Sequence, residues 1–186
     1  TTDDAPTVNE LYKPPLPIKI EAMAVHHITE AMVADKPAFT ESKEFQDLQA
    51  RFEKDEIMVA HNAKFDSGML EKEGLRVPHH IDTLKVARAL DTEGKIPSYK
   101  LQFLRYLLGI EVTATAHDAL GDVLVLEHLF YRLLKKIMER ENVSQDTAVD
   151  VMLDISSKPM MYKFFPFGKY KNQSIEDVAQ QDRGYL

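Results

Sequence analysis

The sequence predicts an α/β domain in which helices flank a sheet, followed by a small α+β extension. Short apolar runs typical of buried strands lie at 57–60 and 81–83, and each runs directly into a helical pattern. The longest helix is expected to begin near Asp118 and to end near residue 141. Because the composition changes after residue 155, we expect one domain over residues 1–155 and a C-terminal appendage over residues 156–186.

The N-terminal third is predicted to form one short strand and then helices. Residues 8–13 read as a strand that the following prolines close, since proline cannot donate to a sheet ladder. Two short helical segments are expected at 20–28 and 30–33, with Thr29 as the N-cap of the second. Apolar residues at helical spacing predict a third helix over residues 40–54.

The two central strands are each predicted to lead into a helix. The run 57–60 continues into the polar stretch 61–66, and residues 81–83 continue into a helix over 84–90. Ligands of open α/β sheets bind at the carboxyl ends of the strands, so residues 61–66 are expected at such an edge. A further helix is predicted at 101–108. The core-facing stripe of the longest helix is expected to contain Val123, Leu126, Phe130, Leu133, Leu134 and Ile137.

The composition is that of a globular chain and restricts the possible chemistry. The 186 residues are 44% hydrophobic and 28% charged, and no apolar run approaches the ~18 residues that span a bilayer, so no membrane partner is expected. The absence of cysteine excludes disulfides and thiolate catalysis, and it permits a cytoplasmic location. A net charge of −7 disfavours bulk binding of nucleic acid, although an enzyme that grips one chain end needs few cationic contacts.

Two histidine–aspartate motifs carry the candidate chemistry. His-Asn-Ala-Lys-Phe-Asp at 61–66 follows the first apolar strand, and His-Asp-Ala-Leu-Gly-Asp at 117–122 opens the longest helix. Asp66 and Asp122 can therefore face one cleft, and their carboxylate oxygens suit Mg²⁺ or Mn²⁺. A pair of ions about 3.5–4 Å apart would stabilise the attacking and leaving oxygens of a hydrolysed phosphodiester. His117 could accept the proton of the attacking water.

Several of these polar residues also have a purely structural interpretation. Asp118 is more typical of a residue that complements the positive end of a helix dipole, and for Asp122 taken alone the two interpretations are equal. Asp82 at a strand–helix junction is more typical of a cap than of a metal ligand. The histidines at 79 and 80 follow a proline and indicate an exposed turn.

The C-terminal run 163–171 interleaves aromatic and basic residues. Such a run could stack unpaired bases and hold phosphates. The alternative is an edge strand with aromatic rings in the core and lysines in solvent. We favour this alternative for the aromatic residues, whereas Lys169 and Lys171 fit both interpretations equally. A helix is expected from Ile175 onward.

The two motifs, taken in order and with their spacing, resemble the second and third motifs of the DEDDh 3′–5′ exonuclease superfamily. The resemblance implies a ribonuclease-H-like mixed sheet flanked by helices. It also implies that Asp66 and Asp122 are ligands of two Mg²⁺ or Mn²⁺ ions and that His117 is the general base. Residues 22–33 resemble the segment that flanks the bound 3′-terminal nucleotide, so His26 is an expected contact to the substrate. Asn62, in the first motif, is a second expected contact.

The two C-terminal segments 167–171 and 182–186 resemble the appendage of the exodeoxyribonuclease X group within this superfamily. The implied function is metal-dependent 3′–5′ hydrolysis of DNA that releases 5′-mononucleotides, with single-stranded or frayed DNA 3′ ends as the partner. Trimming of RNA ends is the first alternative. The second is a catalytically inactive nuclease fold that binds nucleic acid or a protein.

The start of the chain departs from the superfamily pattern. The superfamily opens with a strand that bears an acidic D-x-E pair, commonly followed by two threonines. Thr1 and Thr2 would fit directly after that pair, whereas Asp3 and Asp4 have no preceding strand to aim them inward. We therefore expect that the sequence omits residues before Thr1, and again shortly after Asp4. The missing pair is also the feature that favours the inactive alternative.

Overall fold

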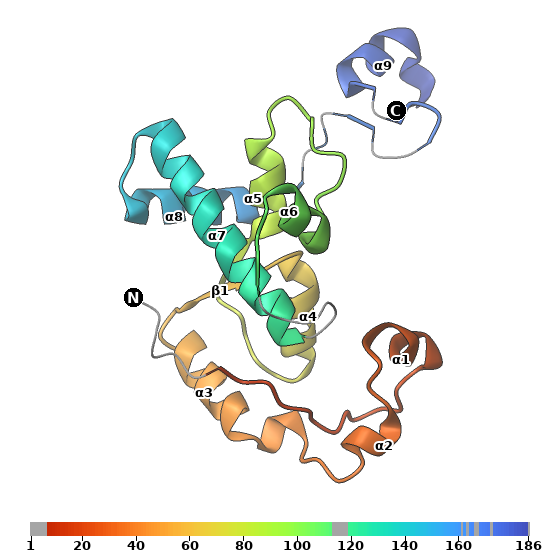
Figure 1. Ribbon diagram of the computed structural model, residues 1–186, viewed down its shortest axis with the longest axis vertical. Helices are drawn as coiled ribbons and strands as arrows, with labels where there is room; N and C mark the ends of the chain where they lie inside the picture. Colours follow the sequence, from red (N-terminus) through yellow and green to blue (C-terminus); the bar gives the residue numbers. More distant parts are fainter. Residues whose placement is uncertain are drawn as a thin grey trace.

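Helices surround a short two-stranded sheet in the computed structural model of the chain (Figure 1). Strands β1 (Ile57–Ala60) and β2 (His79–Asp82) are parallel, with Ile57 opposite His79 and Ala60 opposite Asp82. The predicted α/β class is confirmed. The residues that the structure describes are 7–112, 119–160, 162, 164–165, 168–171 and 173–185. Within these residues, no helix is long and apolar enough to cross a membrane.

Of the N-terminal segment, the described residues 7–52 are mostly helical and add no strand to the sheet. Residues 8–13 do not form the predicted strand: they contribute one bridge, in which Lys13 pairs with Ala38 and its N–H donates to the Pro37 carbonyl at 2.9 Å. The strand prediction was wrong because alternating side chains do not make a strand without a neighbour along the whole segment. The helices that follow are α1 (Ile20–His26), α2 (Glu30–Val33), the 3-10 turn η1 (Phe39–Glu41) and α3 (Lys43–Phe52).

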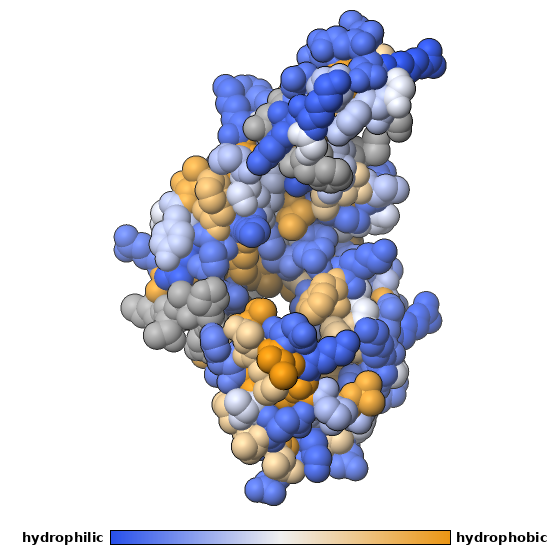
Figure 2. Space-filling model, turned by 90° about the vertical axis from the view of Figure 1, so that its right-hand side faces the viewer, coloured by the Kyte–Doolittle hydropathy of each residue, from blue (hydrophilic) through white to orange (hydrophobic). Residues whose placement is uncertain are grey.

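The third predicted helix begins later than its apolar spacing indicated. Ser42 ends the 3-10 turn, and its hydroxyl accepts a hydrogen bond from the Phe45 N–H at 3.1 Å, so it is the N-cap of α3. Figure 2 shows apolar side chains on the lower part of the molecule, where Figure 1 places α1 to α3. Val8, Leu16, Ile20, Val25 and Met32 are the exposed large apolar residues of this segment.

Each central strand leads into a helix, as predicted. β1 is followed by α4 (Ala63–Lys72), and β2 is followed by α5 (Thr83–Leu90). The histidines at 79 and 80 belong to β2 and pair with the residues at 57 and 58, so the prediction of a turn was wrong, whereas His79 is exposed as predicted. Proline at the preceding position does not interrupt the ladder, because a proline just before a strand withdraws no N–H from it.

The helices α5, α6 (Leu101–Leu107), α7 (Ala119–Glu141) and α8 (Gln145–Ser157) pack on one another, and α8 packs on β2. The predicted stripe of α7 was partly wrong, since Val123 is 55% exposed. The buried face runs through positions four residues apart, because α6 and α8 pack on that side. The buried residues of α7 are Gly121, Val125, Leu129, Leu133, Leu134 and Ile137.

The C-terminal end of α8 is fixed to the strand β2 and to α5. The Asp82 N–H donates to the Ser156 hydroxyl at 2.8 Å, and the Ser156 side chain is buried. The Lys85 ammonium donates to the carbonyls of Ser156 at 2.6 Å and Lys158 at 2.8 Å. A cation at these carbonyls satisfies acceptors that a helix end leaves unpaired.

The C-terminal segment has a small aromatic core of its own. The rings of Phe165, Tyr170 and Tyr185 contact one another at centroid distances of 4.9 to 6.2 Å, beside α9 (Ile175–Gln181) and the 3-10 turn η2 (Arg183–Tyr185). The helix expected from Ile175 is confirmed. The rings pack on each other, as the structural interpretation expected, but the described residues of the run form isolated bridges and not the predicted edge strand. Three of its residues, Lys163, Pro166 and Phe167, lie outside the described residues.

Candidate active site

The first motif lies where the sequence analysis expected it, at the carboxyl end of β1 and the start of α4. Asn62 has a left-handed backbone (φ 71°), a conformation that asparagine adopts more readily than most residues. This turn places Asp66 in the first turn of α4 with an exposed side chain.

Asp82 joins the turns that follow the two strands. Its Oδ1 atom accepts hydrogen bonds from the backbone N–H groups of Asn62 and Leu84, both at 3.0 Å, and of Lys85 at 3.4 Å. The residue is 2% exposed. The prediction that Asp82 is a helix cap is confirmed. The same carboxylate also fixes the backbone of the first motif, a role that the sequence analysis did not foresee.

The charge of the Asp66 carboxyl is affected by partial burial and by the neighbouring Asp82. Partial burial is the main cause that raises the pKa of the Asp66 carboxyl, and the nearby Asp82 charge raises it further. The hydrogen bond from its own backbone N–H and the His61 ring act in the opposite direction. A divalent cation at Asp66 would offset the repulsion between the two carboxylates. Hard oxygen donors of this kind fit Mg²⁺ or Mn²⁺.

His61 is a positioning group in this site. Its Nε2 atom lies 2.7 Å from the Tyr99 carbonyl oxygen, which can only accept, so Nε2 carries a proton. Its Nδ1 atom lies 2.9 Å from the Thr83 hydroxyl. Burial lowers the pKa of His61, and the Tyr99 carbonyl, Asp82 and Asp66 oppose that shift. Both ring nitrogens are therefore engaged inside the protein.

Asp122 lies in the first turn of α7 and is half-buried. The side-chain amide of Gln102, on α6, donates a hydrogen bond to its Oδ1 atom. The side-chain carbonyl oxygen of Gln102 in turn accepts a hydrogen bond from the Arg105 guanidinium at 3.4 Å. This arrangement fixes one oxygen of Asp122. Gln102 was not predicted as a site residue, because nothing in the local sequence pattern marks one glutamine of a short helix as a partner of Asp122.

The remaining residues singled out in the sequence are not part of this strand-end cluster as the structure describes it. His117 and Asp118 lie outside the described residues. His26 is exposed near the end of α1, its Nδ1 atom accepts from the Ile28 N–H at 3.0 Å, and it lines an apolar groove of about 340 Å³ in the N-terminal segment. Within the described residues, no three His, Asp or Glu side chains are grouped so that they could hold one ion.

The fold and the two motifs define an α/β domain with aspartates at helix starts, two of them, Asp66 and Asp82, at the carboxyl edge of its parallel strands. Residues 2–148, which contain both motifs, match the family model described as "Exonuclease", so the chain belongs to the exonuclease family. Residues 165–186 match a second model, described as "Exodeoxyribonuclease X-like C-terminal". The predicted resemblance is thereby confirmed for the domain and for the appendage.

Individual relatives agree with the family match. The chain is 36% identical to exodeoxyribonuclease 10 of Escherichia coli strain K12 over 182 residues, 96% of this chain and 74% of the relative. It is 35% identical to a DNA polymerase III subunit epsilon-like protein of Rhodobacter capsulatus over 70% of this chain and 19% of that protein. The structure of exonuclease X in complex with 5′ overhanging duplex DNA superposes with a TM-score of 0.59 at 31% identity and covers 79% of each chain.

Proposed function

We propose that the protein is a metal-dependent exonuclease that hydrolyses DNA from the 3′ end and releases 5′-mononucleotides. The observation that carries this proposal is the exonuclease-family match over both motifs, combined with the position of Asp66 at the carboxyl edge of the sheet. The relatives support DNA as the substrate: one is an exodeoxyribonuclease, and another is described in complex with duplex DNA. A cytoplasmic location is compatible with the absence of cysteine.

In this proposal Asp66 and Asp122 hold two Mg²⁺ or Mn²⁺ ions. When bound, such ions stabilise negative charge on the phosphate and on the leaving oxygen. Gln102 fixes one oxygen of Asp122, and no hydrogen bond from the described residues occupies the other oxygen. Asp82 keeps the β1–α4 turn in place, so that Asp66 points out of the first helical turn.

His117 would accept the proton of the attacking water. A histidine is suited to this role because its ordinary pKa lies near neutrality. Asn62, exposed at the same edge as Asp66, and His26, on α1, would contact the terminal nucleotide. The partner would be a single-stranded or frayed DNA 3′ end.

A polarity assay tests the proposal directly. The full-length protein is incubated with Mg²⁺ and one oligodeoxynucleotide that is labelled at its 5′ end in one sample and at its 3′ end in another. We expect a ladder of shortening products from the 5′ label and immediate release of labelled mononucleotide from the 3′ label. The reverse pattern, or internal cuts, would contradict the proposed direction.

Variants and a second substrate separate the alternatives. Asp122→Asn and His117→Asn should abolish cleavage, whereas Asp47→Asn, which changes an exposed aspartate of α3, should not. A matched RNA oligomer that is cleaved faster than the DNA would favour the exoribonuclease. Tight DNA binding without cleavage at any Mg²⁺ or Mn²⁺ concentration would favour the inactive module.

A further inference from the structure

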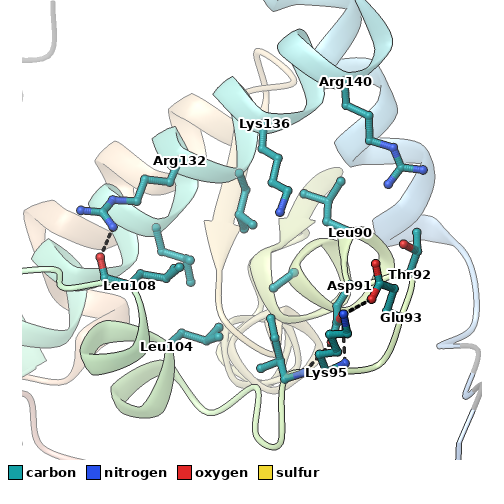
Figure 3. A pocket seen from close by; sticks show the side chains of 14 residues that line it. Leu90, Asp91, Thr92, Glu93, Lys95, Leu104, Leu108, Arg132, Lys136 and Arg140 are labelled. Atoms are coloured by element: carbon teal, nitrogen blue, oxygen red, sulfur yellow. Dashed lines mark hydrogen bonds and ion pairs between the residues drawn. The ribbon is translucent and has the colours of Figure 1, made fainter.

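A cleft of about 500 Å³ lies between α7, α6 and the segment that follows α5 (Figure 3). Its walls are separate from the strand ends that carry the candidate active site. Aliphatic side chains form most of its interior, and the lining contains no aromatic ring. The aliphatic residues of the lining are Ala87, Leu90, Ile96, Leu104, Leu108, Leu129 and Leu133.

One rim of the cleft carries a row of three cations. Arg132, Lys136 and Arg140 follow one another at four-residue intervals on α7, which places them about 6 Å apart along the helix. Figure 3 shows all three projecting from α7 on the side of the cleft. Arg132 donates to the Leu108 carbonyl, and the Nε atom of Arg140 lies 3.3 Å from Glu141. Lys136 has no ion-pair partner within the described part of the chain.

The acidic residues on the opposite rim do not neutralise this row. The Asp91 carboxylate accepts from the N–H groups of Lys95 at 3.1 Å and Ile96 at 2.8 Å, and from the Tyr99 hydroxyl at 2.7 Å. Glu93 forms an ion pair with Lys95. Lys95 offsets the charge of Glu93, whereas Asp91 keeps its negative charge because all of its hydrogen-bond donors are neutral. One uncompensated carboxylate therefore faces the three cations of α7, and the lining stays net positive. This positive row stands out on a chain of net charge −7.

We propose that this cleft binds an acidic, amphipathic peptide segment of a partner protein. Apolar side chains of the peptide would enter the aliphatic interior, and its carboxylates would pair with the row on α7. Carboxylates on alternate residues of an extended peptide are about 6.6 Å apart, close to the spacing of the row. An aliphatic interior with a charged rim is the arrangement expected of a protein interface.

Two observations argue against a nucleic-acid strand as the occupant. Single strands are held by aromatic side chains on which bases stack, and the cleft offers none. Lys136 also lies fourteen residues beyond Asp122 on α7, a separation of about 21 Å at 1.5 Å per residue. A nucleic-acid strand held at the catalytic edge would therefore have to extend along α7 to reach Lys136.

A peptide selection tests the proposal without knowledge of the partner. A displayed library of random dodecapeptides is selected on the full-length protein and counter-selected on the Lys136→Glu variant. We expect enriched sequences in which Asp or Glu alternates with aliphatic or aromatic residues. No enrichment, or enriched sequences without carboxylates, would overturn the proposal.

Fluorescence anisotropy with one enriched peptide then locates the site. Lys136→Glu should weaken binding at least tenfold, and Lys136→Gln should weaken it less. Lys135→Glu is the matched control, because Lys135 is the neighbouring lysine but does not line the cleft and pairs with Glu139 at 3.7 Å. Equal loss in both glutamate variants would indicate unspecific charge attraction and overturn the assignment.

A single-stranded oligodeoxynucleotide serves as competitor in the same assay. We expect no displacement of the peptide at concentrations that saturate the catalytic edge. Displacement of the peptide from the unsubstituted protein would show that the oligonucleotide competes for the cleft, and it would overturn the peptide proposal. DNA cleavage should be unchanged in Lys136→Glu, so a failure of this inference is distinguishable from a failure of the proposed catalysis.

Discussion

The backbone N–H of Asn62 and the carboxylate of Asp82 form a 3.0 Å hydrogen bond that joins the ends of the two parallel strands. The same carboxylate caps α5 through Leu84 and Lys85. One buried aspartate therefore sets both the start of a helix and the turn that presents Asp66. Its position couples the stability of the fold to the geometry of the candidate active site.

Asp82→Ala should lower the free energy of unfolding by about 1–3 kcal/mol, because it leaves the N–H groups of Asn62 and Leu84 without their acceptor. Asp82→Asn keeps an acceptor oxygen and should cost less. Urea unfolding followed by circular dichroism measures both. Asp47→Ala, at an exposed position of α3, is the control for a generic charge change. Equal stability of Asp82→Ala and the wild type would show that the hydrogen bonds of the Asp82 carboxylate do not stabilise the fold.

His61 should make stability depend on pH between neutral and weakly acidic conditions. Burial lowers its pKa in the folded protein, so the unfolded chain binds its proton more readily. The resulting stabilisation is complete above the unfolded pKa of about 6.5 and is lost as the pH falls through it towards the lower folded value. Urea midpoints at several pH values from 8 to 5 should fall less steeply for His61→Gln. If the urea midpoints of the wild type and His61→Gln changed with pH in parallel, His61 would not be the source of the pH dependence.

Gln102 should tune metal binding through Asp122. Gln102→Ala removes the amide that orients the Asp122 carboxylate and should weaken Mn²⁺ binding by about tenfold or more, as removal of such supporting groups typically does. Isothermal titration calorimetry of Mn²⁺ into the metal-depleted protein measures the effect. Gln49→Ala, an exposed glutamine of α3, should bind Mn²⁺ like the wild type. An unchanged affinity in Gln102→Ala would place Asp122 outside the metal site.

The loop before α6 should attach the C-terminal segment to the domain through Gly94. This glycine has a φ of +66°, and a Cβ atom there would overlap the ring of Phe164. Gly94→Ala should therefore loosen the contact and increase proteolytic cleavage between residues 158 and 164. Gly74→Ala controls for backbone strain, because Gly74 has a φ of +92° and open space around it. Equal cleavage rates in the two variants would attribute any effect to strain alone.

The sequence determined the elements whose signals are local. An apolar run is followed directly by the start of a helix at 57–66 and again at 81–90, so both strand–helix units were predicted. The position of Asp66 at the carboxyl edge of the sheet was predicted from the same pattern. The cap role of Asp82 was also predictable, because an aspartate before a helix accepts from N–H groups two and three residues onward in the chain.

Only the tertiary structure decided how these elements use their side chains. The face of α7 that is buried depends on where α6 and α8 pack, and for this reason Val123 is exposed although its spacing predicted a core position. The strand predicted at 8–13 needed a neighbour over its whole length and has one only at Lys13. The pairs Gln102–Asp122 and His61–Tyr99 join residues 20 and 38 positions apart. Periodicity and capping act within a few residues, whereas these contacts depend on how distant segments meet in the folded chain.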